Sequence, residues 1–297
     1  MITGATGYIG SNLTKKLVLE GNDVHVILRP SSDTGLLNDI INHVNIHILN
    51  NETHEIIELL KEVQPHFVIH LAALFTAEHK TEDIRPIIES NILFGVQLLQ
   101  AAASTGVKIF INTGTHWQNS NGCGYNPANL YAASKQAFEC MAGYYTEVYD
   151  MRMLTLKLID TYGPFDHRTK IMNLFKRIAD SGEILGMTPG NQQMGLVYID
   201  DVIKGFIASM ELVENMQPHQ QHSCIVAPDR FYSLKEVAAI FEDVSGKHLN
   251  IEWGKRAYRA REIMEVRFCE PNILNGYNTY SLHEGIELML EKERAKL

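Results

Sequence analysis

The chain has 297 residues, of which 45% are hydrophobic, and its formal net charge at pH 7 is −9. This length and composition suit one large or two closely packed globular domains, and the acidic balance argues against an extended nucleic-acid surface. No apolar run reaches membrane-spanning length, no secretory signal is visible and the first residues already belong to the predicted fold, so we expect a cytoplasmic protein without a targeting segment. Four scattered cysteines without CxxC spacing predict reduced thiols rather than a disulfide, and neither they nor the histidines cluster as a metal site would. The cysteines are Cys123, Cys140, Cys224 and Cys269.

Three glycines lie close to the start of the chain, in the sequence TGATGYIG at residues 3–10. Gly4 allows a tight turn off a strand, Gly7 lets a pyrophosphate approach the backbone, and Gly10 lets the next helix pack against the sheet. That helix, expected from about residue 11 to 20, would direct its first amide groups at the pyrophosphate. Taken alone, the turn is equally typical of a strand–helix connection that binds nothing. Only two residues precede Thr3, so either the first strand is unusually short or the natural start lies upstream.

Strand and helix patterns then alternate, which indicates a doubly wound parallel sheet of the Rossmann type, with helices on both faces. We expect strands at 23–28, 44–49, 67–71, 108–112 and 153–159, and helices at 52–63, 84–104 and 130–149. Shorter units follow Gly163, with helices at 170–181, 200–212 and 233–245 and a strand at 196–199. We predict a dinucleotide-binding domain over residues 1–163, to which residues 196–222 return. Residues 164–195 and 223–297 would form a smaller, discontinuous substrate domain at the carboxyl edge of the sheet.

A tyrosine and a lysine in a YxxxK pair lie one turn apart on one face of the expected helix 130–149. A cation near the phenol of Tyr131 favours phenolate, so Tyr131 and Lys135 together can work as an acid or base near neutral pH. By itself such a pair is more typical of a surface aromatic beside a solvated lysine. However, the strand 108–112 runs into Thr113, whose hydroxyl could bind a substrate carbonyl while Tyr131 moves the proton.

In their order and spacing these motifs resemble the extended short-chain dehydrogenase/reductase family, which contains nucleotide-sugar epimerases, dehydratases and reductases. The match includes TGATGYIG, HLAA at 70–73, Asn91 with Gly95, NTGT at 112–115, YAASK at 131–135, DTYGPFD at 160–166 and VYIDDV at 197–202. The resemblance implies that Thr113 orients the carbonyl and that Tyr131 gives or takes the proton. It also implies that Lys135 holds the cofactor ribose and lowers the pKa of Tyr131.

The cofactor-binding residues are implied in the same way. Besides the three glycines and Lys135 they are Thr6, Tyr8, Ile9, Leu71, Ala72, Ala73 and Asn91. At the end of the second strand NAD favours an acidic residue, whereas Arg29 with Ser31 and Ser32 suits a 2′-phosphate. We therefore favour NADP(H) and keep NAD(H) possible, because Arg29 can also be a solvated arginine at a strand end.

Two further features bear on the reaction. Sugar 4,6-dehydratases of the family carry Asp-Glu where this chain has Gly114 and Thr115, which disfavours dehydration. The segment RAREIM at 259–264 resembles the diphosphate-gripping segment of nucleotide-deoxysugar 4-ketoreductases, with Arg259 on the diphosphate and Arg261 as the alternative. A solvated, charged helix face explains the same segment. The predicted substrate-binding set is Thr115, His116, Asp160, Lys170 and Arg259.

We therefore predict an NADPH-dependent 4-ketoreductase that acts on a nucleotide-linked 4-keto-deoxyhexose. A nucleotide-sugar 4-epimerase with bound NAD and a non-catalytic NADP-binding protein stay open, although the intact Tyr-Lys pair argues against the latter. Members of the family commonly dimerise through two long helices, here 84–104 and 130–149, so we predict a homodimer. Four apolar positions on the second helix serve either such an interface or the core, namely Ala132, Phe138, Met141 and Tyr145.

Overall fold

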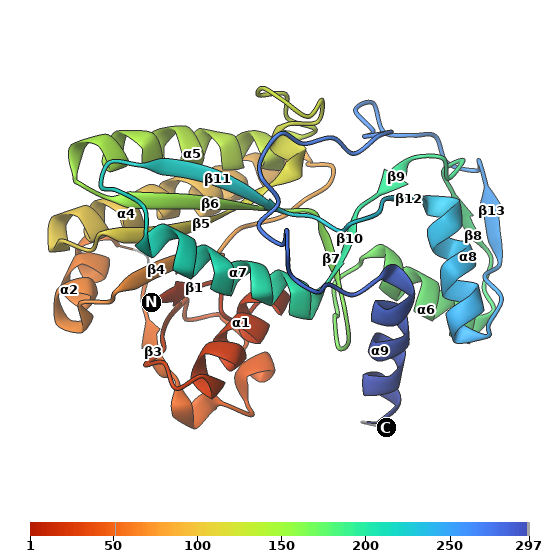
Figure 1. Ribbon diagram of the computed structural model, residues 1–297, viewed down its shortest axis with the longest axis horizontal. Helices are drawn as coiled ribbons and strands as arrows, with labels where there is room; N and C mark the ends of the chain where they lie inside the picture. The colour runs from red at the N-terminus through yellow and green to blue at the C-terminus, as the bar shows by residue number, and fades with distance from the viewer. Residues whose placement is uncertain (51, 296–297) are drawn as a thin grey trace.

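The computed structural model describes residues 1–50 and 52–295, and its centre is one sheet of seven parallel strands (Figure 1). The strands lie in the order β11-β6-β5-β4-β1-β2-β3. Their bounds are β1 (Ile2–Thr3), β2 (His25–Leu28), β3 (Asn45–Ile48), β4 (Phe67–His70), β5 (Ile109–Thr115), β6 (Arg152–Leu158) and β11 (Gln221–Val226). The chain builds outward from β1 in one direction and then returns to build from β4 in the other. The predicted doubly wound parallel sheet is therefore confirmed.

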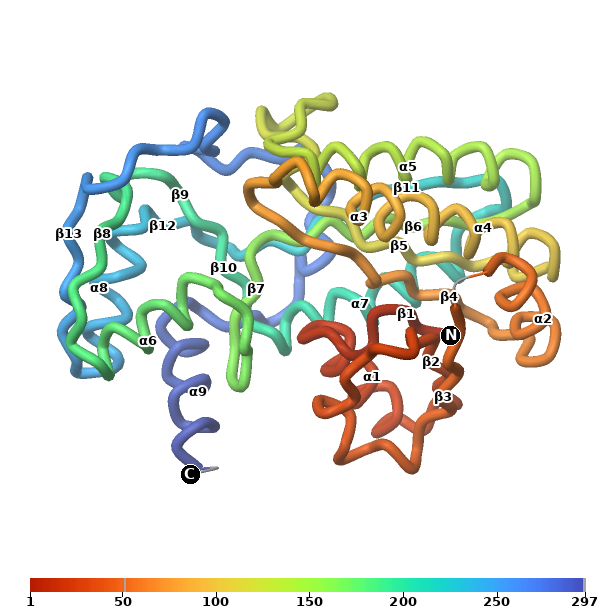
Figure 2. The backbone as a smooth tube through the Cα atoms, turned by 180° about the vertical axis from the view of Figure 1, so that it is seen from behind, coloured from red at the N-terminus to blue at the C-terminus, as the bar shows by residue number. Residues whose placement is uncertain are grey.

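Side chains of the strands alternate between two apolar cores, one on each face of the sheet. Ile109 and Ile111 belong to the core under α1 and α7, whereas Phe110 between them belongs to the core under α2, α4 and α5. Figures 1 and 2 show these two helix layers from opposite sides. The helices are α1 (Tyr8–Leu19), α2 (Thr53–Val63), α4 (Phe94–Thr105), α5 (Leu130–Val148) and α7 (Ile199–Glu214).

The single helix expected over 84–104 is in fact three segments. α3 (Ile84–Ile88) passes through a π-helical turn at Glu89–Leu93 before α4 begins. The buried Asn91 lies in this turn, where its side-chain oxygen accepts from the Leu74 amide at 2.7 Å and its Nδ2 donates to Ser134 Oγ at 2.9 Å. The wider turn is thus held by bonds to distant segments, which periodicity along the helix does not reveal.

The remaining elements form a smaller lobe beyond the carboxyl ends of the strands (Figure 1). Three two-stranded sheets pair β7 (Asp160–Tyr162) with β10 (Leu196–Tyr198), β8 (Leu185–Met187) with β13 (Ile251–Trp253), and β9 (Gln193–Met194) with β12 (Tyr232–Ser233). The helices are α6 (Ile171–Ser181), α8 (Leu234–Ser245) and α9 (Leu282–Arg294). A capping box of Ser233 and Glu236 starts α8. The exact division of the chain into two domains stays a prediction.

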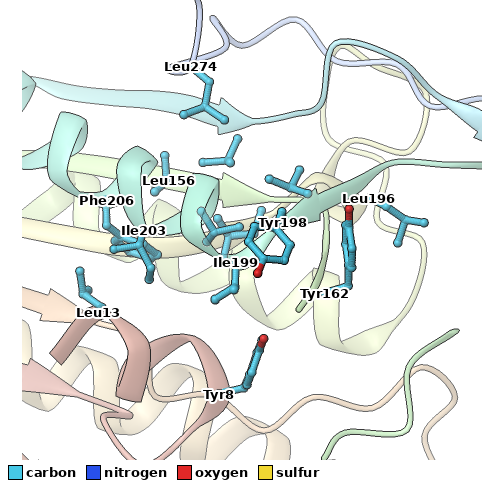
Figure 3. Close-up of a cluster of buried hydrophobic side chains, with 14 of the residues drawn as sticks. Tyr8, Leu13, Leu156, Tyr162, Leu196, Tyr198, Ile199, Ile203, Phe206 and Leu274 are labelled. Atoms are coloured by element: carbon cyan, nitrogen blue, oxygen red, sulfur yellow. The ribbon is translucent and has the colours of Figure 1, made fainter. Parts of the chain in front are cut away.

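One apolar core joins the smaller lobe to the sheet (Figure 3). The ring centroids of Tyr162 and Tyr198 are 5.7 Å apart, and the hydroxyl of Tyr162 donates to the Leu282 carbonyl at the start of α9. The hydroxyl of Tyr8, on α1, donates to the Pro164 carbonyl at 3.1 Å. Side chains of both regions therefore fix the position of the carboxyl edge of the sheet relative to the smaller lobe.

The prediction of four reduced cysteines is wrong, because a disulfide joins Cys123 to Cys269. The prediction rested on sequence spacing, but the fold brings residues separated by 146 positions to a Cα–Cα distance of 5.5 Å. At this place Gly122 also forms a β-bridge with Phe268. Cys140 and Cys224 are free thiols. In the part of the chain that the structure describes, no helix combines the length and apolarity needed to span a bilayer.

Candidate active site

The glycine turn has the geometry that its sequence predicts. Gly4 has φ +73°, and a Cβ on it would lie 2.6 Å from the Ala72 amide nitrogen. A Cβ on Gly10 would lie 2.1 Å from the Gly4 carbonyl oxygen, so only glycine lets α1 pack this close. The contact that a Cβ on Gly7 would make is looser, 3.3 Å from the same oxygen. Space therefore remains beside Gly7, at the start of α1, for an anionic group.

A cavity of about 480 Å³, here called the central cavity, connects this turn to the predicted catalytic residues. The carboxyl end of β5 contributes Thr113 to its wall, and the first turns of α5 contribute Tyr131 and Lys135. On the opposite side its wall is Gly4, Gly7, Tyr8, Ile9 and Gly10. The fold thus brings together the motifs near residues 4–10, 113 and 131–135 that the sequence singles out.

Two buried polar atoms in this wall lack a partner within the described residues, Lys135 Nζ and Thr113 Oγ1. Burial lowers the pKa of the Lys135 ammonium to about 8, and the charge of Glu139 opposes that shift. A buried donor without a partner is costly, so both atoms suit a ligand that completes their hydrogen bonds. A ribose hydroxyl beside Lys135 and a carbonyl oxygen beside Thr113 meet that need, and the residues present therefore fit a dinucleotide.

Tyr131 stands at the beginning of α5, where Asn129 fixes the chain. The side-chain oxygen of Asn129 accepts from the Ala132 amide at 2.9 Å, and its Nδ2 donates to the Thr76 and Ala77 carbonyls. Burial raises the pKa of Tyr131 to about 12, which is opposite to the lowering expected from Lys135. The phenol is thus protonated at neutral pH, the form that a proton donor needs.

A second cavity of about 480 Å³, the outer cavity, lies on the β2 side of the glycine turn. Its wall includes Thr6, Arg29, Ser32, Leu71, Ala72 and Ala73, which are predicted cofactor residues. Arg29 is exposed at the end of β2, and its backbone amide donates to Ser32 Oγ at 3.0 Å. Two other predicted cofactor residues, Ser31 and Asn91, line neither cavity. Asn91 instead ties residue 74 to α5.

Four of the five predicted substrate residues line the central cavity: Thr115, His116, Asp160 and Lys170. Lys170 Nζ lies 2.8 Å from Asp160 Oδ1 and 4.5 Å from the centre of the Phe75 ring. Burial opposes ionisation of Asp160, but Lys170 outweighs it and holds the pKa of this carboxyl below its usual value. Burial lowers the pKa of His116, which is therefore a neutral ring beside this ion pair.

The fifth, Arg259, lines an adjoining cavity of about 360 Å³, here called the rim cavity, to which His116 and Asp160 also contribute. Its guanidinium pairs with Glu262 through two bonds of 2.9 and 2.7 Å and lies 5.3 Å from the centre of the Trp117 ring. Residues 259–264 form a turn at 260–261 within an otherwise irregular segment, so they are not the solvated helix face that was the alternative interpretation. The other candidate, Arg261, donates to Asn126 Oδ1 and also lines the rim cavity.

The family described as NAD dependent epimerase/dehydratase matches residues 1–223. The chain belongs to this family. It is thus an extended short-chain dehydrogenase/reductase, an enzyme that works with a nicotinamide cofactor.

A CDP-abequose synthase of Yersinia pseudotuberculosis is 28% identical over 277 residues, covering 93% of this chain and 94% of that protein. UDP-glucuronate 4-epimerase 1 of Arabidopsis thaliana is 24% identical and covers 97% and 73% respectively. Among solved structures, a UDP-glucose 4-epimerase of Thermotoga maritima with UDP-glucose superposes with a TM-score of 0.86 at 20% identity, covering 99% of this chain and 98% of that one. The last similarity shows the shared fold.

Sequence reasoning missed two residues in the central cavity of this epimerase/dehydratase family member. Phe75 packs edge-on against Tyr131, with ring centroids 5.0 Å apart, and lies under Lys170. Arg168 is fixed by two bonds to Asp166 and lies 4.7 Å from the centre of the Tyr8 ring. Both follow recognised motifs by two residues, HLAA and DTYGPFD, so a search for aromatic or cationic residues just after each motif would find them.

Proposed function

We propose that this chain is an NADPH-dependent 4-ketoreductase of a nucleotide-linked 4-keto-deoxyhexose. The observation that carries this proposal is the central cavity, which joins the glycine turn to Thr113, Tyr131 and Lys135. The one carboxylate among its described lining residues, Asp160, is paired with Lys170. Elimination of water needs an acid and a base there, so the cavity suits carbonyl chemistry better than dehydration.

The bound cofactor would supply a hydride to the keto carbon. The hydroxyl of Thr113 would hydrogen-bond to the carbonyl oxygen and place the carbon for attack. The phenol of Tyr131 would give its proton to that oxygen as the C–O double bond becomes an alcohol, and would regain a proton from solvent. Lys135 would hold the ribose through its ammonium. Each turnover thus consumes one reduced cofactor and one proton.

The choice of NADPH over NADH rests on the outer cavity. Arg29 lies at the end of β2 with Ser32 beside it, where a guanidinium and a hydroxyl could bind a 2′-phosphate. The nucleotide end of the substrate would occupy the rim cavity, with Arg259 on the diphosphate. Similarity to CDP-abequose synthases along 93% of the chain supports a deoxysugar nucleotide.

A nucleotide-sugar 4-epimerase is the second candidate, because a sequence relative over 97% of the chain is a UDP-glucuronate 4-epimerase. The two reactions differ in cofactor balance. We expect the purified protein, given CDP- or dTDP-linked 4-keto-6-deoxyhexoses, to oxidise NADPH in proportion to the alcohol formed. Protein that carries NAD and interconverts 4-epimers without net oxidation would contradict the proposal. Tight NADP binding without turnover on either kind of substrate would instead support a non-catalytic binding protein.

We also propose that the chain forms a homodimer through α3, the π-helical turn and α5. Of the four apolar positions singled out on α5, Ala132, Phe138 and Tyr145 are buried in the core, whereas Met141 is exposed. Other large apolar side chains exposed on these elements are Ile84, Ile88, Leu93, Tyr144 and Val148. Such a strip of exposed apolar side chains suits a contact with a second copy. Light scattering measures the resulting mass directly.

A further inference from the structure

A buried carboxylate stands behind the active-site lysine and has no role in the reaction proposed above. Glu139 follows Lys135 by one turn of α5, so the two side chains share a helix face. Both are buried, at 8% and 1% exposure. Glu139 Oε2 accepts a hydrogen bond from Gln118 Nε2 at 2.7 Å, and Oε1 accepts one from Ser223 Oγ on β11, also at 2.7 Å. The carboxylate is thus built into the protein interior.

Gln118 carries this connection to the end of β5. It is fully buried, and its side-chain oxygen accepts from the Thr115 amide at 2.9 Å. A Cβ on Gly114 would lie only 2.8 Å from the same oxygen, so the amide packs directly on the strand. Glu139 and Gln118 therefore hold in place the strand end that presents Thr113.

The charges around Lys135 explain what else Glu139 does. From β4, His70 faces the lysine, but burial and the charge of Lys135 lower the pKa of that histidine to about 3, so it is neutral. From α5, the phenol of Tyr131 is also neutral at pH 7. From β5, Thr113 offers an uncharged hydroxyl. Glu139 thus supplies the negative charge that opposes the effect of burial on Lys135.

We propose that Glu139 is a positioning residue, which keeps Lys135 cationic for the cofactor ribose and, through Gln118, fixes the strand end that carries Thr113. The first part rests on the proposed function, because it assigns Lys135 to the cofactor. A charged donor binds a hydroxyl more strongly than a neutral one, so loss of the lysine proton weakens cofactor binding.

The test is the pH dependence of NADPH affinity, measured by fluorescence titration on the full-length protein. Wild-type affinity should fall as the pH rises through about 8, where Lys135 loses its proton. Glu139→Gln keeps the size and removes the charge that raises the lysine pKa, so the fall should move to lower pH. We expect NADPH affinity about three- to tenfold below wild type near pH 8 and within about twofold near pH 6.

Matched variants separate charge from packing. Glu147→Gln removes the same charge from an exposed position of α5 and should leave the profile at its wild-type pH. Ser223→Ala removes one hydrogen bond to Glu139 but keeps the charge of Glu139. This variant should also leave the pH profile of NADPH affinity at its wild-type position, while its melting temperature should fall. Lys135→Met should abolish the pH-dependent fall, which assigns that fall to Lys135.

A Glu139→Gln profile that coincides with wild type would overturn the proposal. Should that variant not fold, Glu139→Asp withdraws the carboxylate by one methylene, and we expect a smaller displacement in the same direction. A wild-type profile for the aspartate variant would equally overturn the inference. Because the readout needs no sugar, absence of ketoreductase turnover refutes the proposed function alone. Turnover with an unmoved Glu139→Gln profile refutes this inference alone.

Discussion

The proposed cofactor side and the proposed sugar side of the cavities are built in different ways. On the cofactor side the glycine turn is shaped by the backbone, and the close approach of Gly10 to the Gly4 carbonyl leaves no alternative to glycine at position 10. On the sugar side the cavities are closed by side-chain pairs, Asp160 with Lys170 and Arg259 with Glu262. Paired side chains can be exchanged without disturbing the backbone. We infer that the cofactor side is constrained by the fold, whereas the sugar side is open to adaptation.

The two sides meet at Tyr131, where we expect a substitution to have the largest effect on turnover. Tyr131→Phe should lower kcat by about 10²- to 10⁴-fold, because the phenol proton is lost while the ring remains. NADPH affinity, measured by fluorescence, should be unchanged. Tyr277→Phe, at an exposed tyrosine that lines none of the three cavities, serves as the control and should retain full activity. Near wild-type turnover by the Tyr131 variant would show that the proton comes from elsewhere.

On the cofactor side, Arg29→Ala should weaken NADPH binding by about 10- to 100-fold, the value of one or two hydrogen bonds to a charged group. NADH binding should change little. Ser32→Ala should have a smaller effect in the same direction, whereas Ser31→Ala should have none, since Ser31 lines neither cavity. Equal losses for both nucleotides on the arginine change would mean that the guanidinium does not select NADPH.

On the sugar side, Cys123→Ser opens the disulfide that joins the loop before α5 to the segment with Arg259. Loss of this disulfide, which joins residues 146 positions apart, should lower the free energy of unfolding by about 2–4 kcal/mol. KM for the nucleotide sugar should rise while NADPH affinity stays constant, which denaturation curves and steady-state kinetics would show. Cys140→Ser changes an exposed free thiol and should leave both the free energy of unfolding and the KM for the nucleotide sugar unaltered. A rise in the NADPH dissociation constant would contradict the separation of the two sides.

The smallest effect is expected for Asp160→Asn, which leaves Lys170 unpaired. We expect KM for the sugar nucleotide to rise about two- to fivefold, as befits a partly buried pair. Lys170 holds the pKa of Asp160 below its usual value, so the pair stabilises the folded state above the unfolded pKa and loses this effect as the pH falls. Urea unfolding curves of wild type and variant should therefore differ at pH 7 and converge only as the pH falls below the unfolded value of 3.8. A difference in unfolding free energy between the two proteins that grows as the pH falls would contradict the lowered pKa of Asp160.

The parts of the fold and site that depend on neighbouring residues were predictable from sequence. The turn at Gly4 and the shared face of Tyr131 and Lys135 follow from backbone geometry over a few positions. The doubly wound parallel arrangement of the sheet also followed, since alternating strands and helices allow few arrangements. These features are local or topological, and they include most of the cofactor side. The order of the strands was not predicted, and β11 lies where no strand was expected.

The features that the sequence did not reveal depend on contacts between distant segments. The π-helical turn exists because Asn91 bonds to residues 74 and 134. The disulfide needs the loop around Cys123 to meet the segment around Cys269. The raised pKa of Tyr131 follows from its burial, which the YxxxK spacing cannot show. The spacing predicted that Tyr131 and Lys135 meet in the cavity. It did not predict how deeply the two side chains are buried.

The contact of Tyr8 with the smaller lobe has a thermodynamic consequence. Tyr8 belongs to the glycine turn, yet its hydroxyl binds the Pro164 carbonyl and its ring lies under Arg168. A movement of residues 164–168 on binding of the proposed sugar nucleotide would therefore also shift the start of α1, next to the proposed cofactor site. Linkage makes such coupling reciprocal: the factor by which one ligand changes the affinity of the other is the same in both directions. The order in which the two ligands arrive cannot alter that factor.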